Sequence, residues 1–220
     1  MTRSRRGTID TLWLIVGVFL IIAGYWGPWV VHASPALTLI GLDLAEYVKF
    51  LPEFRSGQLR LWREGFYLPL FATSLTLSLV ASRRELRIPR VARGAVWLSA
   101  LPIALSMLPP AWSPPILWAP EFRPQTIAIV ASLAAMALFP AWRRLPAGVV
   151  SVGLIGLHLA AAVIPTWHFA MMRPAIDLVY ARPVSLGWGL PVMIAGQATV
   201  VAVMASWGLR PRLSAVRRPG

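Results

Sequence analysis

The sequence contains no cysteine and is poor in charged side chains. The absence of cysteine excludes disulfide bonds, thiolate zinc sites, cysteine-ligated iron–sulfur clusters, covalently bound c-type haem and a cysteine nucleophile. Charged residues make up 13% of the 220-residue chain, whereas soluble chains carry about 25%, and hydrophobic residues make up 57%. The composition therefore excludes a soluble globular enzyme and a disordered basic tail.

The sequence also has a single lysine, so nearly all of its positive charge comes from arginine. The arginines account for 20 of the 21 basic residues and stand in clusters between long apolar runs. A net charge of +13 would suit nucleic-acid binding. Clusters between apolar runs are instead typical of a membrane protein oriented by its positive charges. We therefore expect the lipid bilayer, and not nucleic acid, as a partner.

Six apolar segments approach the length of about 20 residues that crosses the hydrocarbon core of a bilayer. They cover residues 11–31, 66–81, 95–108, 126–142, 149–164 and 187–207. We expect an all-α, polytopic transmembrane helix bundle that forms a single integral membrane domain over residues 1–220. The second and third segments are the shortest, and stretches of 10–14 residues can be re-entrant or interfacial.

The charge distribution predicts the orientation of these spans. With the N-terminus inside, the inner segments hold 14 basic and two acidic residues, and the outer segments hold seven basic and six acidic residues. Every inner connection is rich in arginine, which obeys the positive-inside rule. None of the 11 tryptophans falls in mid-span, as expected for side chains that prefer the interface. We expect both termini to be cytoplasmic in a bacterial-type inner membrane.

The first span has one alternative interpretation, a cleavable signal peptide. Residues 1–6 would form its basic region, and Val31, His32 and Ala33 resemble a cleavage site. The apolar run, however, exceeds the usual 7–15 residues and ends in an aromatic–proline cluster. We therefore expect this segment to stay in the membrane.

The long outer loops, residues 32–65, 109–125 and 165–186, are the expected functional face. They hold six of the eight acidic residues and two of the three histidines. Residues 41–52 predict a short amphipathic helix that ends before Pro52, with Leu44, Tyr47, Val48 and Leu51 on one face and Asp43, Glu46 and Lys49 on another. Asp43 and Glu46 could form a carboxylate pair for acid/base work or cation binding. Their spacing favours a capping box with Asp43 at the N-cap.

The candidate binding residues all lie in these outer loops. They are His32, Asp43, Glu46, Arg60, Arg63, His168 and Asp177. Arg60 and Arg63 could grip a phosphate or carboxylate, or lie at the lipid headgroups beside Trp62. No cofactor is predicted, although a b-type haem or a metal held by His32 and His168 is an alternative.

Within the spans, His158 is the only ionisable residue near the middle of the bilayer, and Gln197 is a second strongly polar residue. An ionisable side chain there is a functional candidate, although a hydrogen-bonded structural histidine is favoured. The spans contain none of the acidic or basic residues that relay protons in ion-coupled pumps. Small residues are predicted to form packing faces, within the chain or toward a partner subunit: Gly17, Gly24, Gly153, Gly156, Ala160, Ala195, Gly196 and Thr199.

One sequence echo suggests an internal repeat. Val16-Gly17, His32 and Asp43-Leu44 are matched by Val152-Gly153, His168 and Asp177-Leu178, with one two-residue gap. This match predicts that the first and third hairpins are parallel copies. The tetrapeptide PEFR also occurs twice, at residues 52–55 and 120–123, but one such coincidence is roughly what chance supplies and does not indicate a repeat.

The sequence contains no nucleotide-binding loop, nucleophile elbow, zinc-protease or EF-hand motif. The leading hypothesis is a non-catalytic subunit or accessory binding protein of a membrane complex, which uses its extracytoplasmic loops and assembles with other subunits or with itself. The first alternative is a small transporter, with a polar path through His158, Gln197 and residues 73–78. The second alternative is an extracytoplasmic-face enzyme acting on a lipid-linked substrate, which requires the outer acids and histidines to converge.

Overall fold

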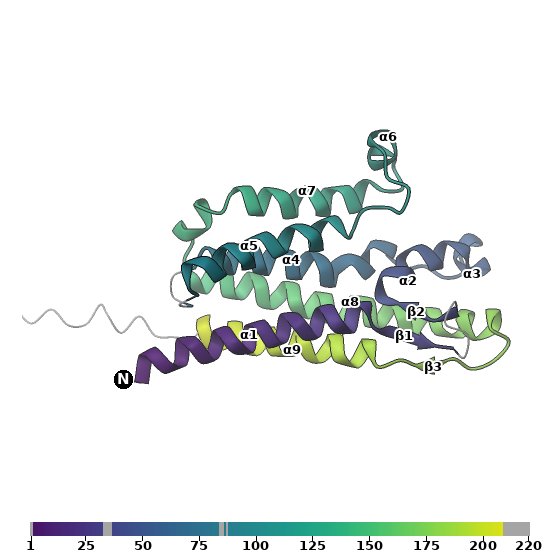
Figure 1. Ribbon diagram of the computed structural model, residues 1–220. Coiled ribbons are helices and arrows are strands. Elements are labelled where there is room, and N and C mark those ends of the chain that lie inside the picture. The colour runs from purple at the N-terminus through teal and green to yellow at the C-terminus, as the bar shows by residue number, and fades with distance from the viewer. Residues whose placement is uncertain (1, 33–36, 84–85, 87, 209–220) are drawn as a thin grey trace, which may run out of the picture.

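The computed structural model describes residues 2–32, 37–83, 86 and 88–208. It is 75% helical, and the all-α class is confirmed. Six helices lie side by side along one axis and alternate in direction (Figure 1). They are α1 (Thr2–Trp26), α4 (Leu68–Ala81), α5 (Arg90–Leu105), α7 (Arg123–Ala137), α8 (Ala147–Val179) and α9 (Gly189–Gly208).

Short elements fill the connections. The short helices are α2 (Gly41–Tyr47), α3 (Pro52–Arg55) and α6 (Pro114–Trp118), with 3-10 turns η2 (Val48–Phe50), η3 (Arg63–Tyr67) and η4 (Ala141–Arg144). Three strands, β1 (Pro28–Val31), β2 (Leu39–Ile40) and β3 (Ser185–Leu186), form a small antiparallel sheet in the order β2-β1-β3. These strands were not expected from the sequence.

Among the described residues, four helical stretches are long and apolar enough to cross a membrane. They are Gly7–Trp26, Arg63–Ala81, Ala147–Val179 and Gly189–Gly208. Helices α5 and α7 have 16 and 15 residues. At 1.5 Å per residue each is shorter than the roughly 30 Å hydrocarbon core. Each of the six expected segments is helical over most of its length. Four of them have the length of a full crossing, and the segments of α5 and α7 do not.

Four expected spans have ends that differ clearly in the structure: α5 begins at Arg90 and not at residue 95, α7 ends at Ala137 and not at residue 142, and the first and fifth spans also differ. The first was expected to reach Val31, but α1 ends at Trp26 and Pro28 begins strand β1. Proline has no N–H to continue a helix, and glycine before it favours a helix end. The fifth was expected to end before Pro165, but α8 continues to Val179. Pro165, His168 and Phe169 are buried along α8, and this packing offsets the hydrogen bond lost at proline.

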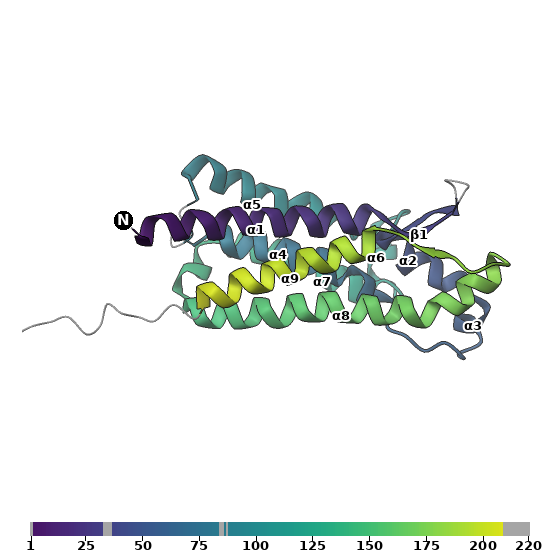
Figure 2. The same ribbon diagram turned by 90° about the horizontal axis from the view of Figure 1, so that it is seen from below.

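The sheet, α2, α3, η2 and η3 lie together at the end of the bundle opposite the N-terminus (Figures 1 and 2). We call this region the cap; it comprises the described residues from 28 to 67 and from 180 to 188. Helix α8 has 33 residues, so it is about 50 Å long and extends past α1 into the cap. Part of the expected outer loop 165–186 is therefore the end of a rigid helix.

Helices α1 and α9 approach closely through small residues. A Cβ on Gly24 would lie 2.2 Å from the Met193 nitrogen, and a Cβ on Gly196 would lie 2.5 Å from the Ile21 nitrogen. The expectation that Gly17, Gly24 and Gly196 form packing faces is confirmed within the chain. Gly153 and Gly156 on α8 have nothing within 4 Å of an added Cβ. They therefore do not pack within the part of the chain that is described.

The two segments proposed as a repeat differ in local structure. His32 follows strand β1, whereas His168 lies inside α8. Gly17 packs against Gly196 and Val200, whereas Gly153 faces open space. The sequence echo therefore does not correspond to two copies of one structural unit.

Candidate binding grooves on the cap

The amphipathic helix expected in the first outer loop is present as α2 and η2, and it ends before Pro52 as predicted. Leu44, Val48 and Leu51 are buried. The capping prediction was off by one turn: Ile40 is the N-cap, and the Asp43 carboxylate accepts the Ile40 backbone N–H at 3.1 Å. Asp43 thus stabilises the start of the helix from its third position.

Glu46 belongs to an ion network centred on Arg63. The Arg63 side chain is only 7% exposed, and its guanidinium lies 3.7 Å from Glu46, 3.1 Å from Glu64 and 3.4 Å from Glu121. It also donates to the Glu121 backbone carbonyl at 2.7 Å. Such charge-assisted bonds are the strong ones, and they hold α2, η3 and the segment before α7 together.

Lys49 extends the same network. Its ammonium pairs with Glu46 and lies 3.0 Å from Glu121. Lys49 and Arg63 both lie over the Phe122 ring, at 5.1 and 5.5 Å from its centre, which adds cation–π attraction. The second PEFR copy therefore supplies two partners that sequence reasoning missed, since nothing in its local pattern points to a contact more than 50 residues away.

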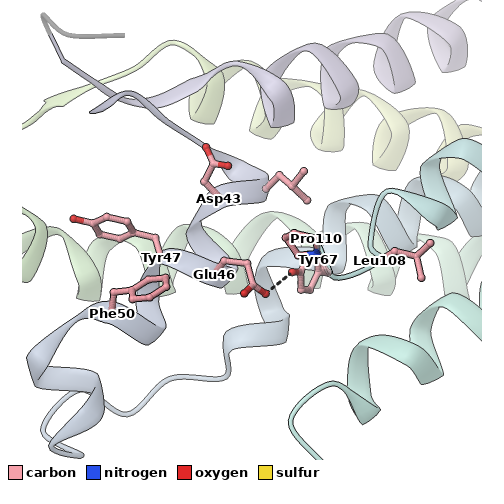
Figure 3. Close-up of a pocket in the computed structure, with 8 residues that line it drawn as sticks. Asp43, Glu46, Tyr47, Phe50, Tyr67, Leu108 and Pro110 are labelled. Carbon is pink, nitrogen blue, oxygen red and sulfur yellow. Dashed lines mark hydrogen bonds between the residues drawn. The ribbon is translucent and has the colours of Figure 1, made fainter. Parts of the chain in front are cut away.

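A groove of about 280 Å³ opens beside this network (Figure 3). Its lining residues are Leu42, Asp43, Glu46, Tyr47, Phe50, Tyr67, Leu108 and Pro110. Tyr67 donates to the Glu46 carboxylate at 3.4 Å. Asp43, Glu46, Glu64 and Glu121 carry four negative charges against the two positive charges of Lys49 and Arg63. We call this the acidic groove.

Tyr47 lies at one side of the acidic groove and links it to Tyr180, which directly follows α8. Burial raises the pKa of Tyr47 to about 12, helped by electrostatic coupling and a hydrogen bond to Tyr180. The Tyr180 hydroxyl in turn donates to the Leu37 carbonyl at 2.8 Å. This chain of hydroxyls favours a neutral Tyr47 that acts as a hydrogen-bond donor.

The other candidate residues lie outside the acidic groove, on the cap or on the end of α8. The Asp177 carboxylate accepts the Val184 backbone N–H at 2.7 Å and so holds the loop before β3. The His32 ring lies 5.3 Å from the Tyr180 ring and lines a different groove. Arg60 is exposed. Asp43 and Asp177 thus accept hydrogen bonds from different backbone N–H groups, and each stabilises its own local segment.

His168 is buried against η3. Its ring lies 5.8 Å from Phe66, and a Cβ on Gly65 would lie 2.8 Å from its Cε1 atom. His32 and His168 share no ring contact and no groove lining among the described residues. Over those residues, no group of three or more histidine, aspartate or glutamate side chains has the arrangement of a metal site.

His158 and Gln197 meet inside the helix bundle. The His158 Nδ1 atom donates to the Gln197 side-chain oxygen, so its Nε2 atom accepts from the Thr76 hydroxyl at 2.7 Å. All three residues are fully buried. This triad joins α4, α8 and α9 and satisfies both ring nitrogens, as a structural histidine requires.

The chain matches no family model, no curated protein and no solved structure.

Proposed function

We propose that the protein crosses a bacterial-type cytoplasmic membrane six times, with both termini in the cytoplasm and the cap outside. The alternating direction of the six helices supports this topology. Exposed tryptophans near both ends of the bundle also support it, since Trp13 lies at one end and Trp167 and Trp188 lie at the other. The short helices α5 and α7 would be accommodated by local thinning of the bilayer.

Because the chain has no cysteine, single cysteines can test this topology without background. We expect Ser56→Cys in the cap and Ala111→Cys between α5 and α7 to react with an impermeant maleimide in intact spheroplasts. Ala141→Cys at the opposite end should react only after permeabilisation. Labelling of Ala111→Cys only after permeabilisation would show that α5 and α7 do not cross.

We further propose that the protein is a non-catalytic subunit or accessory protein, whose acidic groove binds a positively charged group of a partner subunit. The observation that carries this proposal is the combination of the Asp43 and Glu46 carboxylates with aromatic side chains in one groove (Figure 3). Carboxylates and ring faces together recognise ammonium and guanidinium groups. Asp43 and the ion network together carry two excess negative charges, which favour a cation over an anion.

The test is the mass of the complex extracted from native membranes in mild detergent. We expect a partner to co-purify with the wild-type chain and to be lost from Asp43→Asn. Asparagine removes the charge but keeps an oxygen that accepts the Ile40 N–H. Glu53→Gln, which changes a carboxylate outside the acidic groove, is the matched control and should keep the partner. A bare monomer from the wild-type chain would contradict the proposal.

A small permease is the second candidate, because His158, Gln197 and Thr76 converge inside the bundle and do not face lipid. Transport would require these groups to exchange their mutual hydrogen bonds for a substrate. Uptake of labelled polar solutes into proteoliposomes tests this function. If Gln197→Leu leaves uptake unchanged, the path does not run through the triad.

A further inference from the structure

A second groove on the cap carries a fixed positive charge and no carboxylate in its lining. It has a volume of about 290 Å³ and is lined by Val31, His32, Arg182, Pro183, Val184 and Ser185. It opens where strands β1 and β3 separate, just beyond the Val31–Ser185 pair. Its lining offers three kinds of hydrogen-bond donor: a guanidinium, an imidazole and a hydroxyl. We call it the basic groove.

The loop that carries Arg182 is held by bonds to the end of α8. Asp177 accepts the Val184 N–H at 2.7 Å, and Arg173 donates to the Val184 carbonyl at 3.2 Å. The Arg182 N–H donates to the Asp177 backbone carbonyl at 3.1 Å. Ala181, with a positive φ of 51°, makes the turn between them. The backbone of the basic groove is therefore formed before any ligand arrives, which lowers the entropy lost on binding.

The His32 side of the basic groove is held by an aromatic contact. The His32 ring lies 5.3 Å from the Tyr180 ring at an angle of 35°. Tyr180 is itself held by its hydrogen bond to the Leu37 carbonyl. The two sides of the groove thus come from segments about 150 residues apart in sequence, and each side has its own support.

The local charge is the opposite of that in the acidic groove. Around the basic groove, Arg173 and Arg182 carry two positive charges and Asp177 carries one negative charge. The net charge around the basic groove is therefore +1, whereas carboxylates are in excess around the acidic groove. An anion is therefore the ligand class that this groove favours.

We infer that the basic groove binds a phosphate group, with Arg182 as the charged anchor and His32 and Ser185 as additional donors. Three donors from two sides of a groove suit the several acceptor oxygens of a phosphate better than the two coplanar oxygens of a carboxylate. The groove also has room for the organic group of a phosphomonoester. This inference does not depend on the function proposed for the acidic groove.

The phosphate could belong to a lipid headgroup or to a soluble compound. On the proposed topology Trp167 marks the outer interface, and α8 rises about 20 Å from there to Tyr180. The groove itself lies nearer the bilayer than Tyr180, because Ser185 stands three residues from Trp188 at the same interface, about 10 Å in an extended strand. It therefore opens to solution at the outer edge of the headgroups. We therefore expect the soluble source.

Histidine resonances provide the test, because the chain has only three histidines. The full chain, labelled with isotopes at histidine, is placed in phosphatidylcholine nanodiscs and titrated with inorganic phosphate or glycerol 3-phosphate. We expect a saturable shift of the His32 resonance, while the buried His158 and His168 serve as internal references. Potassium chloride at equal ionic strength controls for screening.

Variants identify the anchor. Arg182→Gln should weaken the apparent affinity about tenfold or more, because it removes a charge-assisted contact. Ser185→Ala should weaken it less, and Arg55→Gln, an exposed cap arginine outside the groove, should leave it unchanged. Shifts that appear without added phosphate in phosphatidylglycerol nanodiscs would support a headgroup phosphate as the source. An unshifted His32 with every probe, an equal shift with potassium chloride, or an undiminished affinity in Arg182→Gln would overturn the inference.

Discussion

Gly24 of α1 lies against the backbone of α9 so closely that a Cβ on it would be 2.2 Å from the Met193 nitrogen. Gly24→Ala therefore requires the two helices to separate, at a cost of about 1–3 kcal/mol in the free energy of unfolding. Gly153→Ala is the matched control, because nothing lies within 4 Å of its added Cβ and alanine favours a helix. Thermal unfolding in detergent should show a lower midpoint for Gly24→Ala alone; equal midpoints would contradict this packing.

The His158 triad should stabilise the bundle cooperatively. We expect His158→Leu and Gln197→Leu each to lower the free energy of unfolding by about 1–2 kcal/mol. The double variant should lose less than the sum of the two by roughly 0.6 kcal/mol, since one hydrogen bond is counted twice. Thr199→Val is the control, because the Thr199 hydroxyl donates to the Ala195 carbonyl of its own helix. Additive losses in a double-mutant cycle would show that the ring and the amide do not interact.

Arg63 should hold the cap together. Arg63→Met leaves Glu46, Glu64 and Glu121 with Lys49 as their remaining cation, so we expect the cap to lose about 1–3 kcal/mol of local stability. Hydrogen exchange should accelerate in residues 41–67 and stay unchanged in α1 and α9. Arg60→Met replaces an exposed arginine and should have no effect.

The same network predicts a compensating change. In the Arg63→Met background, Glu121→Gln should restore part of the protection because it removes one unbalanced negative charge. A further loss of protection in the double variant would mean that Glu121 contributes through contacts other than its charge.

Tyr47 should titrate well above the ordinary tyrosine pKa of about 10. Its pKa is raised to about 12, so its neutral form is favoured by folding. A raised folded-state pKa contributes stability that is complete below pH about 10 and is lost as the pH rises toward 12. The difference in 295 nm absorbance between the wild-type chain and Tyr47→Phe isolates this titration. Tyr180→Phe should move it toward 10, because it removes the hydrogen bond; a Tyr47 component already near 10 would contradict the link.

The helices were predictable because apolar runs of this length have few other ways to satisfy their backbone in a bilayer. The amphipathic helix at residues 41–51 was also predictable, since its periodicity is local. The partners of Arg63 were not: Glu46 lies 17 residues before it and Glu121 lies 58 residues after it, and only the packing of α7 against η3 brings them together. The sequence also did not predict that the candidate residues line two separate grooves, because tertiary packing decides which distant segments meet.

Two prolines show where the sequence stops being decisive. Composition and charge alone predicted apolar helices with arginine-rich connections on one side, because hydrophobicity and charge depend only on which residues each segment contains. Pro28 ends α1, whereas Pro165 lies within α8 and the helix continues for four turns beyond it. The residue type is the same in both cases, so the sequence rule for proline predicts the same result. The difference comes from tertiary contacts. Along α8, buried contacts outweigh the one hydrogen bond that Pro165 cannot make. After Trp26, the chain instead forms strand β1, which pairs with β2 and β3.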